Sequence, residues 1–210
     1  LAGCNLGGEG SKDSLGKSDV PVLSAINAQT TNEDTAKTVM LEATDEDAGD
    51  TLTYSATSST ASVTIGVSAA TLTLTPAANW NGTATITALV NDGTVDSAEQ
   101  TFTLTVSAVN DAPVLSAINA QTTNEATAKS VSLSGSDVDG ADVLTYSATS
   151  SNSDVVITVD NKTLTLTPNS DWNGSATITA KVNDGTADST EQTFDLTVNA
   201  FTSGSTFKGK

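Results

Sequence analysis

The sequence contains no histidine and no arginine, a single cysteine, and only eight cationic residues, all of them lysine, against 25 acidic ones. Without clustered Arg and Lys, the chain offers no surface suited to nucleic-acid phosphates, and an anionic membrane would repel its net charge of −17. Without His, it lacks the commonest general base and the usual ligand of zinc and copper. The chemistry that remains is that of carboxylate, amide and carbonyl oxygens, which suit hard cations.

Two copies of one module fill most of the chain. Residues 21–108 align with residues 113–200 at an offset of 92 (113 − 21), without a gap, and 61 of the 88 aligned positions are identical. A module of this size can bury its own core, which disfavours a solenoid of shorter repeats. We therefore predict an N-terminal segment (1–18), a first domain (19–109), a second domain (110–200) with its linker (110–113), and a C-terminal tail (201–210).

Within each module, apolar residues alternate with Thr or other small residues, as in Thr71–Thr75 and Thr101–Val106. This period of two places one side of a strand on a core and the other toward water, and Asn-Gly, Asp-Gly and Thr-Pro turns separate the runs. We predict an all-β fold of two tandem seven-stranded sandwiches of the immunoglobulin-like or cadherin-like type. The strands expected in the first are Val22–Ile26, Thr38–Ala43, Leu52–Ala56, Val63–Val67, Thr71–Thr75, Gly82–Val90 and Gln100–Ser107, with counterparts 92 residues later.

One tryptophan occurs in each module, in a Trp-Asn-Gly turn before the sixth predicted strand. We predict that Trp80 and Trp172 close the end of each sandwich, because Trp is heavily buried on average. The alternative is an exposed ring that stacks on a sugar, as in a carbohydrate-binding module.

The acidic residues gather in loops that we expect at one end of each sandwich. In module two, Asp137 and Asp139 follow the second strand, Asp184 follows the sixth, and all three are predicted to converge on the linker at Asp111. Glu33 is expected at the far end of module one, facing the same linker. Crowding these five carboxylates without a cation is electrostatically costly, whereas calcium takes about 6–8 oxygen ligands at about 2.3–2.6 Å. We predict a calcium site there; the alternative is that the Asp-rich loops are solvated turns.

Three motifs resemble those of bacterial cadherin-like tandem repeats, and more distantly cadherins, over residues 19–200. They are Asp-x-Asp-x-Gly-Asp followed by Leu-Thr-Tyr-Ser, Asn-Asp-Gly after the sixth strand, and Val-Asn-Asp-Ala-Pro at the linker. Cadherins carry Asp-x-Glu before the sixth strand, where this chain has Asn-Trp-Asn or Asp-Trp-Asn, which implies one or two ions and weak affinity, roughly 10⁻⁴–10⁻³ M. The junction ligands that the resemblance implies are Glu33, Asn110, Asp111, Asp137, Asp139 and Asp184.

Module one carries most of a second site at its own start, formed by Asp19, Asp45, Asp47 and Asp92. Glu125 and Asp171 form a half-site at the opposite end of module two. Joined between molecules, such half-sites would produce a head-to-tail filament. The tail from Phe201 could add as a strand to a neighbour's sheet, or be a disordered terminus.

The chain begins Leu-Ala-Gly-Cys, which resembles the lipobox of bacterial lipoproteins, and a Gly/Ser-rich stretch follows it. In that interpretation Cys4 receives lipid and residues 5–18 form a flexible tether, so that the lipid is the only membrane contact. The alternative is a chance match around one inert thiol.

We predict a non-enzymatic, calcium-binding protein of the bacterial cell surface, an outer-membrane lipoprotein or an extracellular protein. Its roles would be adhesion, biofilm matrix or filament assembly, and its partners surface proteins or other copies of itself. An enzyme is disfavoured because no catalytic set with His exists and the paired carboxylates lie at domain ends, not in a cleft. The alternative function is a carbohydrate-binding surface module.

Overall fold

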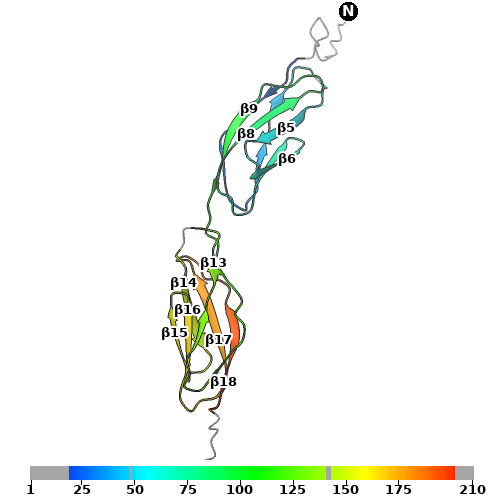
Figure 1. Ribbon diagram of the computed structural model, residues 1–210. Helices are drawn as coiled ribbons and strands as arrows, with labels where there is room; N and C mark the ends of the chain where they lie inside the picture. The colour runs from blue at the N-terminus through cyan, green and yellow to red at the C-terminus, as the bar shows by residue number, and fades with distance from the viewer. Residues whose placement is uncertain (1–18, 48, 141–142, 202–210) are drawn as a thin grey trace, which may run out of the picture. The chain divides into compact units, whose positions relative to one another are not determined.

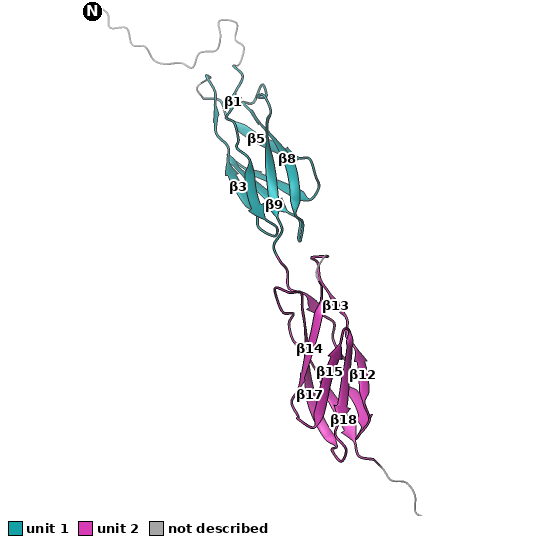
Figure 2. Ribbon diagram, turned by 90° about the vertical axis from the view of Figure 1, so that its left-hand side faces the viewer, with its two compact units in different colours: residues 1–109 teal, residues 110–210 magenta. Residues whose placement is uncertain are grey.

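The computed structural model describes residues 19–47, 49–140 and 143–201. The chain divides between Val109 and Asn110 into two compact units, called unit 1 and unit 2 below (Figure 2). All regular secondary structure in the described residues is β-strand, so the all-β prediction is confirmed. No helix in this part of the chain is long and apolar enough to cross a membrane. Cys4, the tether, Asp142 and the tail beyond Phe201 lie outside the described residues.

Nine strands in the described part of unit 1 recur in the same order in unit 2. In unit 1 they are β1 (Val22–Leu23), β2 (Gln29–Asn32), β3 (Lys37–Met40), β4 (Ala43–Thr44), β5 (Thr53–Ser58), β6 (Val63–Ser68), β7 (Thr71–Pro76), β8 (Gly82–Asn91) and β9 (Gln100–Ser107). In unit 2 they are β10 (Val114–Leu115), β11 (Gln121–Asn124), β12 (Lys129–Ser132), β13 (Gly135–Ser136), β14 (Thr145–Ser150), β15 (Val155–Asp160), β16 (Thr163–Pro168), β17 (Gly174–Asn183) and β18 (Gln192–Asn199). Figure 1 labels β8 and β9 of unit 1 and their counterparts β17 and β18 of unit 2.

Each unit is a sandwich of a four-stranded and a three-stranded sheet, with a short two-stranded ladder beside them. In unit 1 the strand orders are β2-β9-β8-β5, β3-β7-β6 and β1-β4, and unit 2 repeats them as β11-β18-β17-β14, β12-β16-β15 and β10-β13. The pairs β2–β9 and β11–β18 are parallel, and the other pairs are antiparallel. Two tandem sandwiches were predicted, and this part of the prediction is confirmed.

Each unit begins with two short strands, one in the two-stranded ladder and one in the four-stranded sheet, where the sequence predicted a single strand. In unit 1, β1 pairs with β4 at Leu23 and Ala43, and after a crossover β2 pairs with β9. The sequence of β2, Gln-Thr-Thr-Asn, has no apolar residue and therefore no alternation to mark it. The predicted second strand is likewise interrupted, so that β3 and β4 replace a continuous run.

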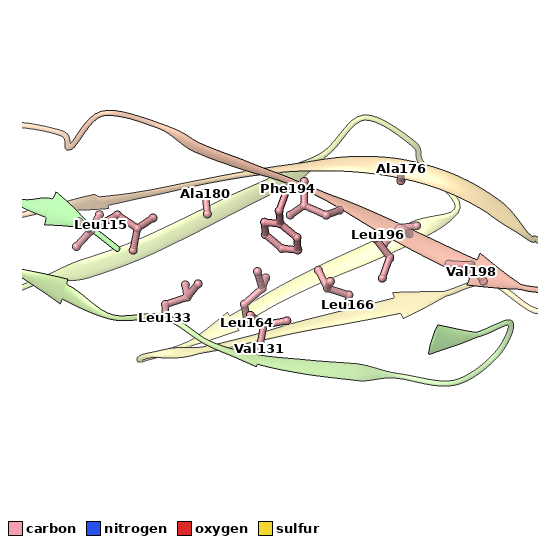
Figure 3. Packing of buried hydrophobic residues seen from close by; sticks show 13 residues of the cluster. Leu115, Val131, Leu133, Leu164, Leu166, Ala176, Ala180, Phe194, Leu196 and Val198 are labelled. Carbon is pink, nitrogen blue, oxygen red and sulfur yellow. The ribbon is translucent and has the colours of Figure 1, made fainter. Parts of the chain in front are cut away.

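Each unit has its own hydrophobic core, built from the apolar half of the alternating strands. In unit 2, Leu164, Leu166 and Leu196 are fully buried, and side chains of both sheets point toward one another in the space between them (Figure 3). Unit 1 buries the equivalent Leu72, Leu74 and Leu104. The intervening Thr residues on β9 and β18 stay exposed, so the period of two translates directly into the two faces of each sheet.

Both tryptophans are partly buried and pack against the core of their own unit, as predicted. The turn on either side of each ring needs unusual backbone angles: Asn79 and Asp171, just before the rings, have φ of 54° and 67°, and Gly82 and Gly174, two residues after them, have φ of 144° and 146°. A Cβ on Gly82 would lie 3.1 Å from the ring of Trp80. The glycine therefore supplies both the positive φ and the close approach of the ring.

Candidate metal centre

The Asp137–Asp139 loop of unit 2 follows β13 directly and is held by its own carboxylate. The backbone N–H of Asp139 donates to Oδ1 of Asp137 at 2.9 Å, a local turn that Asp favours. The second oxygen of the same carboxylate, Oδ2 of Asp137, is buried and accepts no hydrogen bond within the described residues. Oδ1 of Asp137 therefore stabilises the loop, and Oδ2 is available to bind a cation.

The start of unit 2 is tied to this loop and to the loop after β17. The backbone N–H of Asp111 donates to Oδ2 of Asp139 at 2.8 Å, and the side-chain amide of Asn110 donates to Oδ2 of Asp184 at 3.0 Å. Because Asn110 and Asp111 are neighbours in the chain, these two bonds bring both acidic loops to the linker. The five predicted ligands that lie in unit 2 are thus gathered at one end of it.

Asp184 is 7% exposed, and its environment favours the charged carboxylate. Its pKa is lowered by the hydrogen bonds it accepts from the backbone N–H of Ala187, the side chain of Asn110 and the backbone N–H of Thr186, in that order. Oδ1 accepts from Thr186 at 2.6 Å and from Ala187 at 2.7 Å. These bonds fix the carboxylate with its negative charge in place at neutral pH.

Unit 1 repeats this arrangement at its N-terminal end. The backbone N–H of Asp47 donates to Oδ1 of Asp45, and that of Asp19 donates to Oδ2 of Asp47, both at 2.8 Å. Oδ2 of Asp45, like that of Asp137, is buried and accepts no hydrogen bond within the described chain. Asp92, the equivalent of Asp184, accepts from the backbone N–H groups of the second and third residues after it at 2.6 and 2.7 Å.

Asp50 joins the acidic group of unit 1 and was not among the predicted ligands. One carboxylate oxygen of each of Asp45, Asp47 and Asp50 lies within 4.8 Å of the other two. The sequence did carry a signal, since Asp50 recurs 92 residues later as Asp142. Asp171, predicted in a half-site, is exposed in the turn before Trp172, at the end of unit 2 opposite the Asp137 loop.

Glu33 holds the exit of the last strand of unit 1. It is 4% exposed, and its Oε1 accepts a hydrogen bond from the backbone N–H of Val109, the residue before Asn110. Glu125 does the same in unit 2, where its Oε1 accepts from the backbone N–H of Phe201 at 2.6 Å. Both glutamates therefore lie where the chain leaves their unit.

The ligand atoms on offer are all oxygens, mostly from carboxylates. Neither acidic group contains the His or Cys that zinc and copper prefer, because the chain has no His and its one Cys is at position 4. Buried carboxylate oxygens on short, turn-forming loops match the ligand preference of calcium. The residues present therefore fit a hard divalent cation.

Two family models match the chain, one for each unit. A cadherin-like domain matches residues 17–107, and a bacterial Ig domain matches residues 110–197. Such domains are typically non-enzymatic structural or adhesion modules of extracellular proteins, and cadherin-like domains generally bind calcium. The two units are thus cadherin/Ig-like domains in tandem, as predicted. Among the curated proteins, none matches this chain.

Solved structures of cadherins resemble the chain in fold. The human mucin-like protocadherin EC1-2 fragment is 19% identical, with 86% of this chain and 98% of that one covered and a TM-score of 0.48. The human desmocollin-1 ectodomain is 16% identical, with 89% and 43% covered and a TM-score of 0.42. A protocadherin gammaB7 EC3-6 fragment, solved as a cis-dimer, is 18% identical, with 87% and 51% covered and a TM-score of 0.42. The chain spans about half or less of the last two.

Proposed function

We propose that this chain is a calcium-binding, non-enzymatic structural or adhesion protein of the bacterial cell surface or extracellular space, whose two domains become a stiff pair when calcium is bound. The observation that carries the proposal is the buried Oδ2 of Asp137, repeated by Oδ2 of Asp45, each without a hydrogen-bond partner in the described residues. Leaving a buried polar atom unsatisfied costs about 1–3 kcal/mol, and more for a charged group. Coordination of a cation removes that cost.

The junction site in this proposal consists of the gathered residues of unit 2 together with Glu33 of unit 1. The bond from Val109 to Glu33 and those from Asn110 and Asp111 to Asp184 and Asp139 involve three consecutive residues of the chain. The chain is thus bonded to an acidic residue of unit 1 just before the division and to acidic residues of unit 2 just after it. Residues from both sides would then hold the same calcium, and the linker would stiffen.

The second site in the proposal lies at the start of unit 1, where Asp19, Asp45, Asp47 and Asp92 are joined by Asp50. Its arrangement of backbone bonds to carboxylates matches that of unit 2. A partner that supplies an acidic residue such as Glu125 would complete it, which is the basis for proposing head-to-tail assembly in a filament or biofilm matrix. Attachment to the outer membrane through Cys4 belongs to the same proposal.

Calcium titration with a fluorescent reporter of unit 2 tests the junction site. With Trp80 replaced in the variant W80F, Trp172 is the sole tryptophan and reports the unfolding of unit 2. Calcium at about a hundred times its dissociation constant should raise the free energy of unfolding by about 2.7 kcal/mol. The substitutions D137N and D139N together should abolish this gain while keeping the shape of the loop.

The matched control is the pair D160N and D195N, which removes the same charge from exposed residues of β15 and β18. This control should leave the calcium-induced rise in the free energy of unfolding unchanged, because these residues are outside the acidic loops. An equal response to calcium in both double variants would disprove the site. Small-angle scattering of the unmodified chain in calcium and then in chelator tests the stiffening, and identical profiles would contradict it.

A further inference from the structure

A cavity of about 340 Å³ opens in unit 2, between the crossover that joins β10 to β11 and the edge strand β12. Unit 1 has a cavity at the same place, of about 200 Å³. Pockets that bind small molecules start at about 300 Å³. The cavity of unit 2 reaches this size, and that of unit 1 does not.

The divided first strand creates the cavity. The backbone N–H of Ser116 still donates to the carbonyl of Ser134 at 2.8 Å, after which the chain leaves this side of the sandwich. It joins the other sheet at Gln121, which pairs with Leu196 of β18. Because β12 pairs with β16 on its other side, the cavity remains open between β12 and the crossover. Ile118 and Val131, which belong to the core or pack against it, line this cavity.

The lining of the two cavities differs in bulk and charge. Ser132 and Ser134 stand in unit 2 where unit 1 has Met40 and Glu42, two larger side chains, one of them anionic. Among the described residues that line the cavity of unit 2 there is therefore no carboxylate, and Lys129 is the charged one. We call it the serine cavity; its other polar lining residues are Ser116, Asn119, Gln121, Ser130, Ser132 and Ser134.

We infer that the serine cavity binds a sugar residue of a glycan. Hydroxyl and amide side chains each donate and accept hydrogen bonds, which matches a ligand whose surface is mostly hydroxyl groups. Ile118 and Val131 offer an apolar floor for the C–H face of the ring. Lys129 adds a single cationic donor, so the site suits a neutral sugar or one with a single carboxylate.

An extended peptide paired with the edge of β12 is the competing ligand. The backbone edge is common to both units, since β3 and β12 have the same register with β7 and β16. What distinguishes unit 2 is its side chains, because the small hydroxyls of Ser132 and Ser134 stand where unit 1 has Met40 and Glu42. This difference favours a ligand recognised by hydroxyl groups over one recognised by backbone pairing.

The inference does not depend on calcium, because none of the lining residues belongs to the acidic loops. It is tested on the whole chain by amide chemical-shift mapping, once in calcium and once in chelator. The probes are maltotriose, triacetylchitotriose, galactotriose and trigalacturonic acid. At least one should shift the amide signals of Ser130, Ser132 and Ser134 in a saturable way and leave those of Thr38, Met40 and Glu42 unchanged.

Exchange of the two linings supplies the matched variants. S132M with S134E gives unit 2 the lining of unit 1 and should weaken binding about tenfold or more, the effect of one or two lost hydrogen bonds. M40S with E42S should create binding in unit 1. Because Met and Glu already occupy these positions in unit 1, both variants are expected to fold, and their amide spectra verify this.

Four results would overturn the inference. Three of them are the absence of a saturable shift with all four probes, equal shifts in units 1 and 2, and binding that survives S132M with S134E. A fourth is a larger shift with the extended peptide acetyl-Lys-Thr-Val-Thr-Val-Lys-amide than with any sugar. That result would mean that the serine cavity binds a peptide strand paired with the edge of β12. Calcium binding can fail without affecting these outcomes, so the two proposals are judged separately.

Discussion

Units 1 and 2 share 61 of 88 aligned residues and the same order of strands, yet they differ in three places that affect their chemistry. Unit 2 has the larger cavity, an ion pair between Lys181 and Asp188, and a tyrosine bonded to the backbone at Gly135. The Asp residues that form the acidic loops are the same in both. The comparison teaches that the same strand order and the same Asp positions are compatible with different side chains at the cavity, at the ion pair and beside the tyrosine.

The largest expected effect is on the core, and it tests whether the units unfold independently. L166A removes a fully buried side chain of unit 2 and should cost about 2–5 kcal/mol. L74A is the equivalent change in unit 1. Single-tryptophan backgrounds, W80F and W172F, report each unit separately. Each Leu variant should destabilise its own unit, and equal loss in both would show one cooperative structure in place of two.

The next effect separates two glutamates that make the same local bond. E33Q and E125Q each replace a carboxylate that accepts from the backbone N–H after the last strand. Only Glu33 is followed directly by an acidic linker, since the residues Thr202 and Ser203 stand in the sequence where Asn110 and Asp111 follow Val109. By calorimetry, E33Q should therefore weaken calcium binding about tenfold or more, because ligand charge sets affinity, and E125Q much less. Equal effects would remove Glu33 from the junction site.

A smaller effect concerns Gly135, where unit 1 has Ala43. The backbone N–H of Gly135 donates to the hydroxyl of Tyr146 at 3.0 Å, and a Cβ at this position would lie 2.9 Å from the same oxygen. G135A should therefore cost about 1–2 kcal/mol in chemical denaturation of unit 2, through the displaced hydroxyl. In a Y146F background the same change should cost clearly less. An undiminished cost there would place the strain elsewhere.

The smallest effect is expected at the ion pair of Lys181 and Asp188. Nζ of Lys181 lies 2.6 Å from Oδ2 of Asp188, and both side chains are exposed. The hydrogen bond between them lowers the pKa of Asp188 and raises that of Lys181. A carboxyl with a lowered pKa stabilises the fold above its unfolded pKa and loses this contribution as the pH falls through its folded pKa. A lysine with a raised pKa loses its contribution as the pH rises through that value.

K181L reproduces Leu89 of unit 1 and tests this pair. Thermal melts of the variant should differ slightly from those of the parent chain near neutral pH, and the difference should vanish in acid and shrink with salt, since exposed ion pairs contribute little. The reverse exchange, L89K, should give unit 1 the same pH dependence, because Asp96 occupies the position of Asp188. A difference that persists in acid would point to packing of the lysine stem.

Much of the fold was predictable from short-range patterns in the sequence. The repeat gave the number of domains, and the alternation of Leu, Ile and Val with Thr on β7, β8 and β9 marked strands with one buried face, because side chains alternate across a strand. The acidic loops were also predictable, since Asp, Asn and Gly favour turns and recur at fixed spacing. Asp50 was missed as a member of its group although it follows the same spacing.

The sequence by itself determined an all-β pair of modules with carboxylates at their ends and no nitrogen or sulfur ligands in the acidic loops. The tertiary structure alone decided that the start of each unit divides between the ladder and the four-stranded sheet, because β2 has no apolar residue and its place follows from pairing with β9. It also decided which carboxylate oxygens of Asp45 and Asp137 are buried with no hydrogen-bond partner among the described residues, and that the crossover leaves the serine cavity. Each of these depends on contacts between residues far apart in the chain, which local patterns do not encode.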